Sequence, residues 1–187
     1  MKISLLILVL LASLSVAAAT RLPIIQLGHP TLRLEARVMD LKELADKNVQ
    51  TFIDDMIYTM KKAGGVGLAA PQVNQSIRLF VMKSGLQVPL TVVINPTVEY
   101  LTEYGTESSV EGCLSIPGQR LKIERYKRIR MSYYNRQGEF ISEEVKGFKA
   151  IISQHEYDHL NGVLIVDLIQ QMFTQFDYVD YVNAPLM

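Results

Sequence analysis

Cysteine, net charge and repetition are all scarce in this chain. Its 187 residues include one cysteine, and 19 Lys and Arg residues balance 19 Asp and Glu residues to a formal net charge of zero. One cysteine excludes a disulfide framework, and no internal repeat or low-complexity linker divides the chain. With 49% hydrophobic residues, the chain is long enough to bury a full core, so its composition predicts one globular domain.

Histidine is also scarce, and two of the three histidines lie close together. Residues 154–162 read QHEYDHLNG, in which His155, Glu156 and His159 form an H-E-x-x-H motif. Residues four apart on a helix lie on one face, so both imidazoles can bind one cation. Glu156 is rotated away from that line and can contact a water bound to the cation. The motif predicts a metallohydrolase, although so short a match also arises by chance.

The residues around the motif predict that it lies on a helix. Phe148, Ile151, Ile152 and His155 recur at spacings of three and four, and Gly162 stands where a left-handed C-terminal cap is expected. The three apolar residues share a face with His155, so they can form a wall of an apolar pocket beside the metal. A stripe that simply faces the core is the alternative interpretation.

Two histidines leave a catalytic metal short of a protein ligand, since such sites use three ligands and one open position. No histidine follows His159, and the later acids Asp167, Asp177 and Asp180 form no obvious ligand pattern. Cys113 as a thiolate would complete a Cys-His-His set. Sulfur favours ferrous iron, zinc or nickel over magnesium or calcium. The alternative is that Cys113 is a small buried apolar residue.

Residues 65–72 (GVGLAAPQ) fit the dinucleotide-binding pattern G-x-G-x-x-A, which needs a strand before it and a helix after it. Their context is reversed: residues 49–60 have an amphipathic helical pattern that ends at Gly64, and residues 77–82 are strand-like. A nucleotide site is therefore disfavoured. The small residues suggest instead that the backbone lies close to a ligand, with the Gln72 side chain as an amide donor.

Together these segments resemble the peptide deformylase family. Residues 65–72, 111–115 (EGCLS) and 154–162 match its three signature motifs in order and spacing. Residues 26–33 and 93–96 extend the likeness to about residues 21–168. The resemblance implies removal of the N-formyl group from N-formylmethionyl peptides, with release of formate. It also implies ferrous iron as the usual metal, with zinc, nickel or cobalt as substitutes.

Strand-like runs predict an α+β fold. They cover residues 91–94, 98–102, 128–134 and 139–145, and a turn signal at residues 135–138 separates the last two. The resemblance implies antiparallel β-sheets around a central helix that carries H-E-x-x-H. We assign residues 20–168 to this catalytic domain.

Amide hydrolysis needs a nucleophile at neutral pH, and a bound cation can lower the pKa of a water to about 7. Cys113, His155 and His159 would hold that cation. Glu156 would take the proton of the water and pass it to the leaving amine.

The remaining candidate residues stabilise the oxyanion or bind substrate. The oxyanion donors would be the metal, the Gln72 side chain and, as the resemblance implies, the Leu114 backbone N–H. The residues expected to bind substrate are Val66, Gly67, Gly112, Phe148, Ile151 and Ile152.

Residues 1–19 fit a secretory signal peptide. Met1 and Lys2 precede an apolar run over residues 3–14 and a small-residue segment that predicts cleavage after Ala19. A short membrane anchor is the alternative. We therefore predict an exported or periplasmic protein with no stable membrane partner after cleavage. Family members act inside the cytosol or an organelle on chains emerging from ribosomes, so the runner-up is a cytoplasmic protein that begins near Arg21.

Lysine and arginine are missing from residues 150–187. Contact with RNA or DNA requires positive charge, because basic side chains replace the counterions of the phosphates. We therefore expect no DNA partner and no docking of the C-terminal end on the ribosome. The helical spacing of Ile169, Met172, Phe173 and Phe176 predicts that residues 169–187 form a tail packed on the domain.

Two other functions stay open. One is an exported metalloamidase or peptidase that acts on another small N-acyl or peptide substrate, and formate release separates it from a deformylase. The other is a non-catalytic metal-binding scaffold. Glu156 and Gln72 argue against the scaffold, because a site that only bound metal would need neither.

Overall fold

The computed structural model describes residues 18–83, 85 and 89–173. Nearly all of the predicted signal peptide lies outside these residues, as does the predicted tail beyond residue 173. No helix in these ranges is long and apolar enough to cross a membrane.

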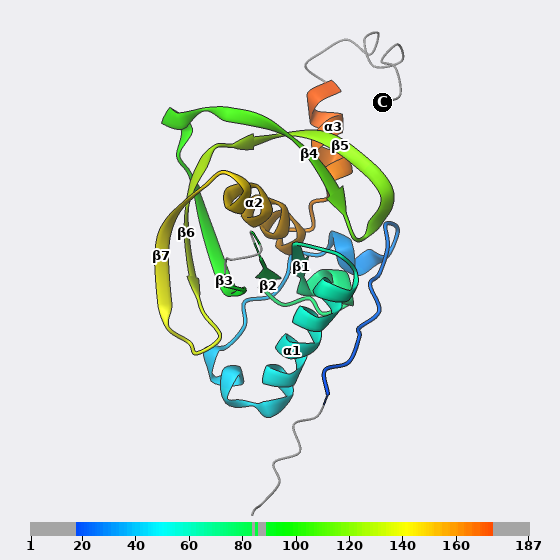
Figure 1. Cartoon of the computed structure of the whole chain (residues 1–187), viewed down its shortest axis with the longest axis vertical. Coiled ribbons are helices and arrows are strands. Elements are labelled where there is room, and N and C mark those ends of the chain that lie inside the picture. The colour runs from blue at the N-terminus through cyan, green and yellow to red at the C-terminus, as the bar shows by residue number, and fades with distance from the viewer. Residues whose placement is uncertain (1–17, 84, 86–88, 174–187) are drawn as a thin grey trace, which may run out of the picture.

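Within the described residues, seven strands form two antiparallel sheets around a central helix (Figure 1). The five-stranded sheet has the order β1-β2-β3-β6-β7, with β1 Gly67–Ala69, β2 Leu79–Met82, β3 Thr91–Tyr100, β6 Arg128–Tyr134 and β7 Phe140–Lys146. The second sheet pairs β4 Thr106–Cys113 with β5 Ile116–Tyr126. The helices are α1 Lys47–Lys62, α2 Phe148–Leu160 and α3 Ile165–Phe173, with short 3-10 helices at Pro30–Arg33, Leu41–Ala45, Ala70–Val73 and Thr102–Tyr104.

Helix α2 carries the H-E-x-x-H motif and is enclosed by the curved strands (Figure 1). The buried Gln154 of this helix is bonded to a neighbouring strand. Gln154 accepts from the Tyr126 N–H at 3.0 Å and donates to the Tyr126 carbonyl at 2.9 Å, which joins α2 to β5. The predicted α+β fold, with antiparallel sheets around this helix, is confirmed.

Glycine ends helix α2 as predicted. Gly162 has φ +71°, and a Cβ there would lie 2.7 Å from the Arg33 carbonyl oxygen. The backbone N–H groups of Gly162 and Val163 bond back to the carbonyls of the last helical turn. Only glycine combines this left-handed conformation with so close a neighbour.

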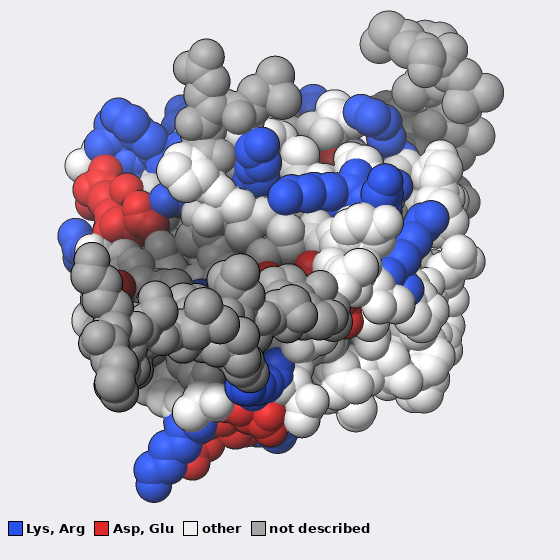
Figure 2. All heavy atoms as spheres, turned by 60° about the horizontal axis from the view of Figure 1, so that its bottom comes forward, with Lys and Arg blue, Asp and Glu red and all other residues white. Residues whose placement is uncertain are grey.

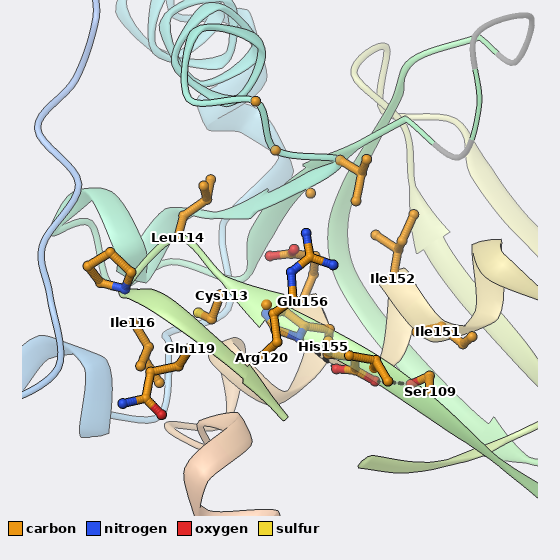
Figure 3. Close-up of a pocket in the computed structure, with 18 of the residues that line it drawn as sticks. Ser109, Cys113, Leu114, Ile116, Gln119, Arg120, Ile151, Ile152, His155 and Glu156 are labelled. Carbon is orange, nitrogen blue, oxygen red and sulfur yellow. Dashed lines mark hydrogen bonds and ion pairs between the residues drawn. The ribbon is translucent and has the colours of Figure 1, made fainter. Parts of the chain in front are cut away.

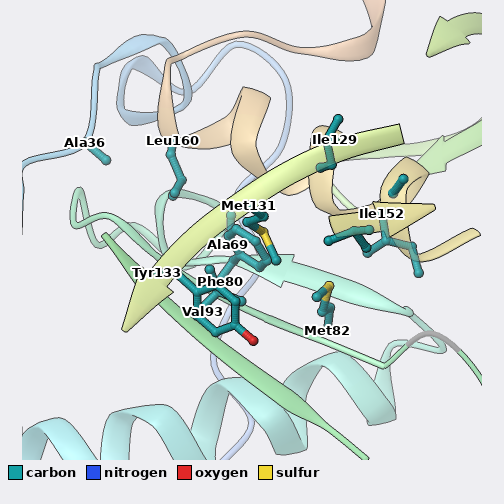
Figure 4. Close-up of a cluster of buried hydrophobic side chains, with 12 residues drawn as sticks. Ala36, Ala69, Phe80, Met82, Val93, Ile129, Met131, Tyr133, Ile152 and Leu160 are labelled. Atoms are coloured by element: carbon teal, nitrogen blue, oxygen red, sulfur yellow. The ribbon is translucent and has the colours of Figure 1, made fainter. Parts of the chain in front are cut away.

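The main core cluster lies between the five-stranded sheet and α2 (Figure 4). Phe80, Met82 and Val93 from β2 and β3 meet Met131 from β6 and Ile152 from α2. Strand positions that point to one face of a sheet alternate, so β2 and β3 place these side chains against the helix. Packing in this core therefore holds α2 in place without a contribution from a metal.

Helix α1 confirms the amphipathic pattern over residues 49–60. Asp46 caps its first turn by accepting from the Asn48 N–H at 2.8 Å, and Gly64 follows its end with φ +72°. Its buried face, including Ile53 and Met56, packs against β1 and β2 in a second core cluster.

The predicted strand runs are present, with small differences in their bounds. The predicted runs 91–94 and 98–102 form one strand, β3, with a register shift between Ile94 and Thr97. Asn95 at this bulge has φ +50°, and its side chain bonds the Met39 backbone at 2.9 and 2.8 Å. Residue Thr102 lies in a 3-10 helix, and β7 begins at Phe140 instead of Glu139.

Strands β4 and β5 had no counterpart among the predicted strands. Their side chains are exposed at many positions and charged at several, so the hydrophobic alternation is weak. Only the pairing of the two strands with each other shows why they are extended.

Helix α3 packs its first turns near β5, and Ile169 joins a cluster that also contains Cys113 and Ile123. The predicted domain boundary at residue 168 falls inside this helix. The face of the molecule in Figure 2 carries Lys and Arg side chains as well as patches of Asp and Glu. Side chains of both charges therefore occur on this face.

Candidate active site

A pocket of about 820 Å³ opens beside the N-terminal half of α2 (Figure 3). It is walled by the segment around β1, by β4 and β5 with the turn between them, and by α2. All six residues predicted to bind substrate line it: Val66, Gly67, Gly112, Phe148, Ile151 and Ile152. Five other predicted site residues line it as well: Gln72, Cys113, Leu114, His155 and Glu156. His159 does not line the pocket but contacts Cys113.

The three predicted metal ligands meet at one point. The candidate ligand atoms of Cys113, His155 and His159 lie within 4.8 Å of one another, and all three residues are buried. The Cys113 Sγ is 3.3 Å from His159 Nε2. Cys113 ends β4, and the two histidines lie one turn apart on α2. The close approach of β4 to α2 therefore brings the three side chains together.

The surroundings of the two imidazoles fit a bound divalent cation. The His155 Nδ1 is 2.9 Å from Glu111 Oε2, which leaves Nε2 as its ligand atom. Burial lowers the pKa of His159 well below its usual value, so this ring is in the neutral form that binds metal. A thiolate and two imidazoles form a donor set suited to iron, zinc, nickel or cobalt.

For His155, burial favours the neutral ring, but hydrogen bonds to Cys113 and Glu111 outweigh it and raise the pKa to about 10. A cation that binds here must displace a proton from His155. Metal binding at this site is therefore coupled to proton release.

Glu156 is buried in the pocket wall beside β1. A Cβ on Gly67 would overlap its carboxylate, so only glycine leaves room for this side chain. Burial raises the pKa of Glu156 to about 7. Its Oε2 and the His159 Nδ1 are buried with no hydrogen-bond partner among the described residues. An unpaired carboxylate oxygen aimed into a pocket is free to bond a reactant.

Gln72 is held in one orientation by its neighbours. Its Oε1 accepts from the Ala69 N–H at 2.9 Å, and its Nε2 donates to Ser115 Oγ at 3.2 Å and to Cys113 Sγ at 3.6 Å. The amide nitrogen therefore faces the metal-binding residues. Leu114 follows Cys113 in the turn, and its side chain lies against Gly65, where a Cβ would approach Cδ1 to 2.8 Å.

Sequence reasoning missed the groups that support this site. Glu111, Ser115 and Asp158 were part of quoted motifs but had no assigned role, and Arg125 was not considered. Glu111 and Arg125 form a buried ion pair, and Arg125 also binds Asp158. Burial would raise the pKa of Glu111, but hydrogen bonds from Arg125 and His155 lower it to about 2. In the sequence, the only sign of these supporting groups was that Glu111 and Asp158 lie within two residues of a predicted metal ligand.

The enclosed helix, the Cys-His-His set and the adjoining pocket define a metal-dependent hydrolase of α+β architecture. The family model described as polypeptide deformylase matches residues 21–174. The chain belongs to the polypeptide deformylase family.

Relatives agree over most of their length. A peptide deformylase from Fusobacterium nucleatum is 44% identical over 145 residues, which are 78% of this chain and 82% of that protein. The crystal structure of peptide deformylase from Thermotoga maritima superposes with a TM-score of 0.74 at 44% identity, over 79% of this chain and 97% of the other. A class I type b peptide deformylase from Acinetobacter baumannii, bound to Met-Ala-Ser, gives a TM-score of 0.75 at 34% identity, over 81% and 99%.

The predicted function is thereby confirmed: the chain is a metallohydrolase that removes the N-formyl group from N-formylmethionyl peptides. The predicted export is wrong. The relatives are peptide deformylases, and this family membership contradicts an exported protein. An apolar run with small residues after it was weaker evidence of location than the family.

Proposed function

We propose that Cys113, His155 and His159 hold one divalent cation at the pocket floor and that Glu156, Gln72 and Leu114 act on the formyl group. The observation that carries this proposal is the meeting of the three ligand atoms within 4.8 Å, directly beside a pocket that Glu156 and Gln72 also line. Metal-assisted hydrolysis gives a role to each of these buried groups, the cysteine, the two histidines and the unpaired carboxylate.

Ferrous iron is the proposed metal, with zinc, nickel or cobalt as substitutes. When bound, the cation supplies Lewis acidity that makes a water nucleophilic near neutral pH. The thiolate of Cys113 supports a soft or borderline metal over magnesium or calcium. If the metal is ferrous iron, activity decays in air and persists under anaerobic conditions. An enzyme as active in air as without it points to zinc or nickel.

Glu156 carries the proton. Its carboxylate takes a proton from the attacking water and passes it to the amine that leaves when the formamide bond breaks. The free Oε2 atom is the acceptor, since it is not bonded to any described residue. Gly67 has no side chain and therefore leaves space for the Glu156 carboxylate.

Gln72 and Leu114 stabilise the oxyanion that forms on the formyl oxygen. The Gln72 Nε2 has two protons, and the bonds from Ala69 to Oε1 keep this nitrogen pointed at the site. The Leu114 backbone N–H is the second donor, because Leu114 lies on the pocket wall next to Cys113. Donors set in place before the reaction stabilise developing charge without reorganisation.

The pocket selects methionine at the first position of the peptide. Val66, Phe148, Ile151 and Ile152 supply apolar walls next to His155 that suit an unbranched thioether side chain. Gly67 and Gly112 bring bare backbone to the same pocket, where it can bond an extended peptide. A Met-Ala-Ser peptide is bound in the structure of the Acinetobacter relative, which supports a peptide that begins with methionine as the ligand of this pocket.

The decisive experiment measures formate from formyl-Met-Ala-Ser with protein loaded anaerobically with ferrous iron. Acetyl-Met-Ala-Ser is the matched control, since it offers the same side chains with a different acyl group. Formate release without acetate release supports the proposal. Cleavage of the acetyl peptide at an equal rate would favour a broader amidase, and a metal-loaded protein that cleaves neither would be a scaffold.

Two predictions about partners stay predictions: that the C-terminal end does not dock on the ribosome, and that the chain has no DNA partner. The lack of Lys and Arg in residues 150–187 supports the first of them. Cosedimentation with ribosomes at low salt tests the first.

A further inference from the structure

A buried ion-pair cluster of Glu111, Arg125 and Asp158 adjoins His155. Arg125, on β5, is 5% exposed. Its Nε and Nη2 donate to the two oxygens of Glu111 at 2.8 and 2.9 Å, and its Nη1 donates to Asp158 Oδ2 at 2.6 Å. One guanidinium thus joins β5 to β4 and to α2.

The Glu111 carboxylate is fully used by this cluster. Its Oε1 accepts from Arg125 and from Ser109 Oγ at 2.7 Å, and its Oε2 lies 2.9 Å from both Arg125 Nη2 and His155 Nδ1. A carboxylate has about four acceptor sites, so these four contacts leave it a single orientation. The ring of His155 is fixed by that orientation.

We propose that Arg125 is a positioning residue for the metal site: it holds the Glu111 carboxylate, and Glu111 holds the His155 ring with Nε2 toward the cation. This inference rests on the proposed metal site. Arg125 lies outside all three sequence motifs and 12 positions beyond Cys113, and it acts through Glu111 without touching substrate or metal.

The physical reason is the charge that this part of the molecule buries. Glu111 is 6% exposed, and the side chain of Asp158 is 16% exposed. Buried carboxylates need a partner that satisfies their oxygens, and removal of one partner leaves an uncompensated charge. Without Arg125, Glu111 loses two of its four bonds and is free to rotate away from His155. Groups that orient a ligating histidine in this way typically change metal affinity by about ten- to a hundredfold.

Arginine suits this position better than lysine. Its planar fork reaches both oxygens of Glu111 and still has Nη1 for Asp158, which a single ammonium cannot match. A lysine at residue 125 would keep the charge but lose the two-bond contact. The proposal therefore predicts a graded effect between arginine, lysine and an uncharged residue.

Co(II) titration of the metal-free protein tests the proposal. We expect Arg125→Met to bind Co(II) about ten- to a hundredfold more weakly than the wild type and to change the visible spectrum of bound Co(II), because His155 is no longer held. The Co(II) affinity of Arg125→Lys should lie between those of the wild type and Arg125→Met. Deformylation per bound metal should fall in the same order.

Arg130→Met is the matched control. Arg130 also pairs with a carboxylate, Glu99 at 3.0 Å, but on the exposed surface of β6. Its Co(II) affinity should equal that of the wild type. In the double variant Arg125→Met/Glu111→Gln, the loss should be no greater than in Glu111→Gln alone, because both residues act through one contact.

Three results would overturn the inference or its basis. The first is a folded Arg125→Met variant whose Co(II) affinity and spectrum equal those of the wild type, which would show that Arg125 is merely structural. If Arg125→Met does not fold, the same result in Arg125→Lys would show this. Losses that add in the double variant would exclude action through Glu111. Failure of the wild-type protein itself to bind Co(II) would instead refute the proposed metal site.

Discussion

At the scale of single residues, the site depends on side chains that the surrounding structure restrains. Gln72 is held by Ala69 and Ser115, and His155 is held by Glu111. Glu156 differs, because one oxygen of its carboxylate has no partner among the described residues. The site thus combines fixed ligands with one free proton acceptor.

Glu156→Gln should separate proton transfer from metal binding. The amide has nearly the same shape and fits beside Gly67, but it cannot accept a proton. We expect metal content to stay at the wild-type level while kcat/KM falls by about three or more powers of ten, since both proton transfers are lost. Metal analysis and formate release are measured on the same preparation. Joint loss of metal and activity would contradict the role assigned to Glu156.

Cys113→Ser should show the opposite pattern. A hydroxyl does not replace the soft thiolate, so iron or zinc affinity should fall sharply. The substitution is small, and Cys113 is buried, so the fold should persist. Metal stoichiometry by elemental analysis checks this, with circular dichroism as the control for folding. Unchanged stoichiometry would remove Cys113 from the ligand set.

At the scale of elements, the end of α2 sets how the two histidines face β4. The helix stops at Asn161, and Gly162 turns the chain where the Arg33 backbone passes close by. A longer or displaced helix would move His159, which lies three residues before that glycine. The turn therefore fixes the end of the helix close to His159.

Gly162→Ala should destabilise the protein by on the order of 1–3 kcal/mol more than a matched glycine change. The added methyl meets both a left-handed φ of +71° and the Arg33 carbonyl. Gly105→Ala is the control, because Gly105 has φ +69° with nothing within 4 Å of an added Cβ. Urea unfolding gives the difference. Equal losses in the two variants would show that the contact with Arg33 is readily relieved.

At the scale of the whole molecule, a metal would connect parts that are far apart in the sequence. Cys113 belongs to the two-stranded sheet, while His155 and His159 belong to the central helix. A ligand that binds only the folded state stabilises it by mass action. Metal occupancy should therefore raise the stability of the entire domain.

Removal of the metal by a chelator should lower the Tm by on the order of 10 °C, because a site occupied at about 1,000 times its Kd contributes about 4 kcal/mol. Differential scanning calorimetry of loaded and metal-free protein measures the shift. The Cys113→Ser variant should show little further change on chelation. A wild-type Tm that does not respond to chelation would argue against a metal that joins β4 to α2.

The helices α1 and α2 could be predicted from the sequence because their signals are local, and the proposed metal ligands and proton carrier were likewise chosen from the sequence and lie together in the structure. His155 and His159 are one turn apart, helix ends coincide with glycines, and apolar residues recur at the helical period. Cys113 was found by its rarity and by resemblance to a family. The exported or periplasmic location was wrongly predicted from the apolar run of residues 3–14 and the small residues that follow it, a pattern that records apolar character and nothing of the reaction.

Only the tertiary structure decided what holds those residues in place. Arg125 lies 14 residues from Glu111 and 33 from Asp158, and no sequence period relates the three. The sequence likewise did not show that Gly67 makes room for Glu156, or that β4 and β5 pair as a sheet of their own. Local order follows from the bonding and periodicity of neighbouring residues. A buried charge cluster forms only when distant segments enclose it and exclude water, and that requires the complete fold.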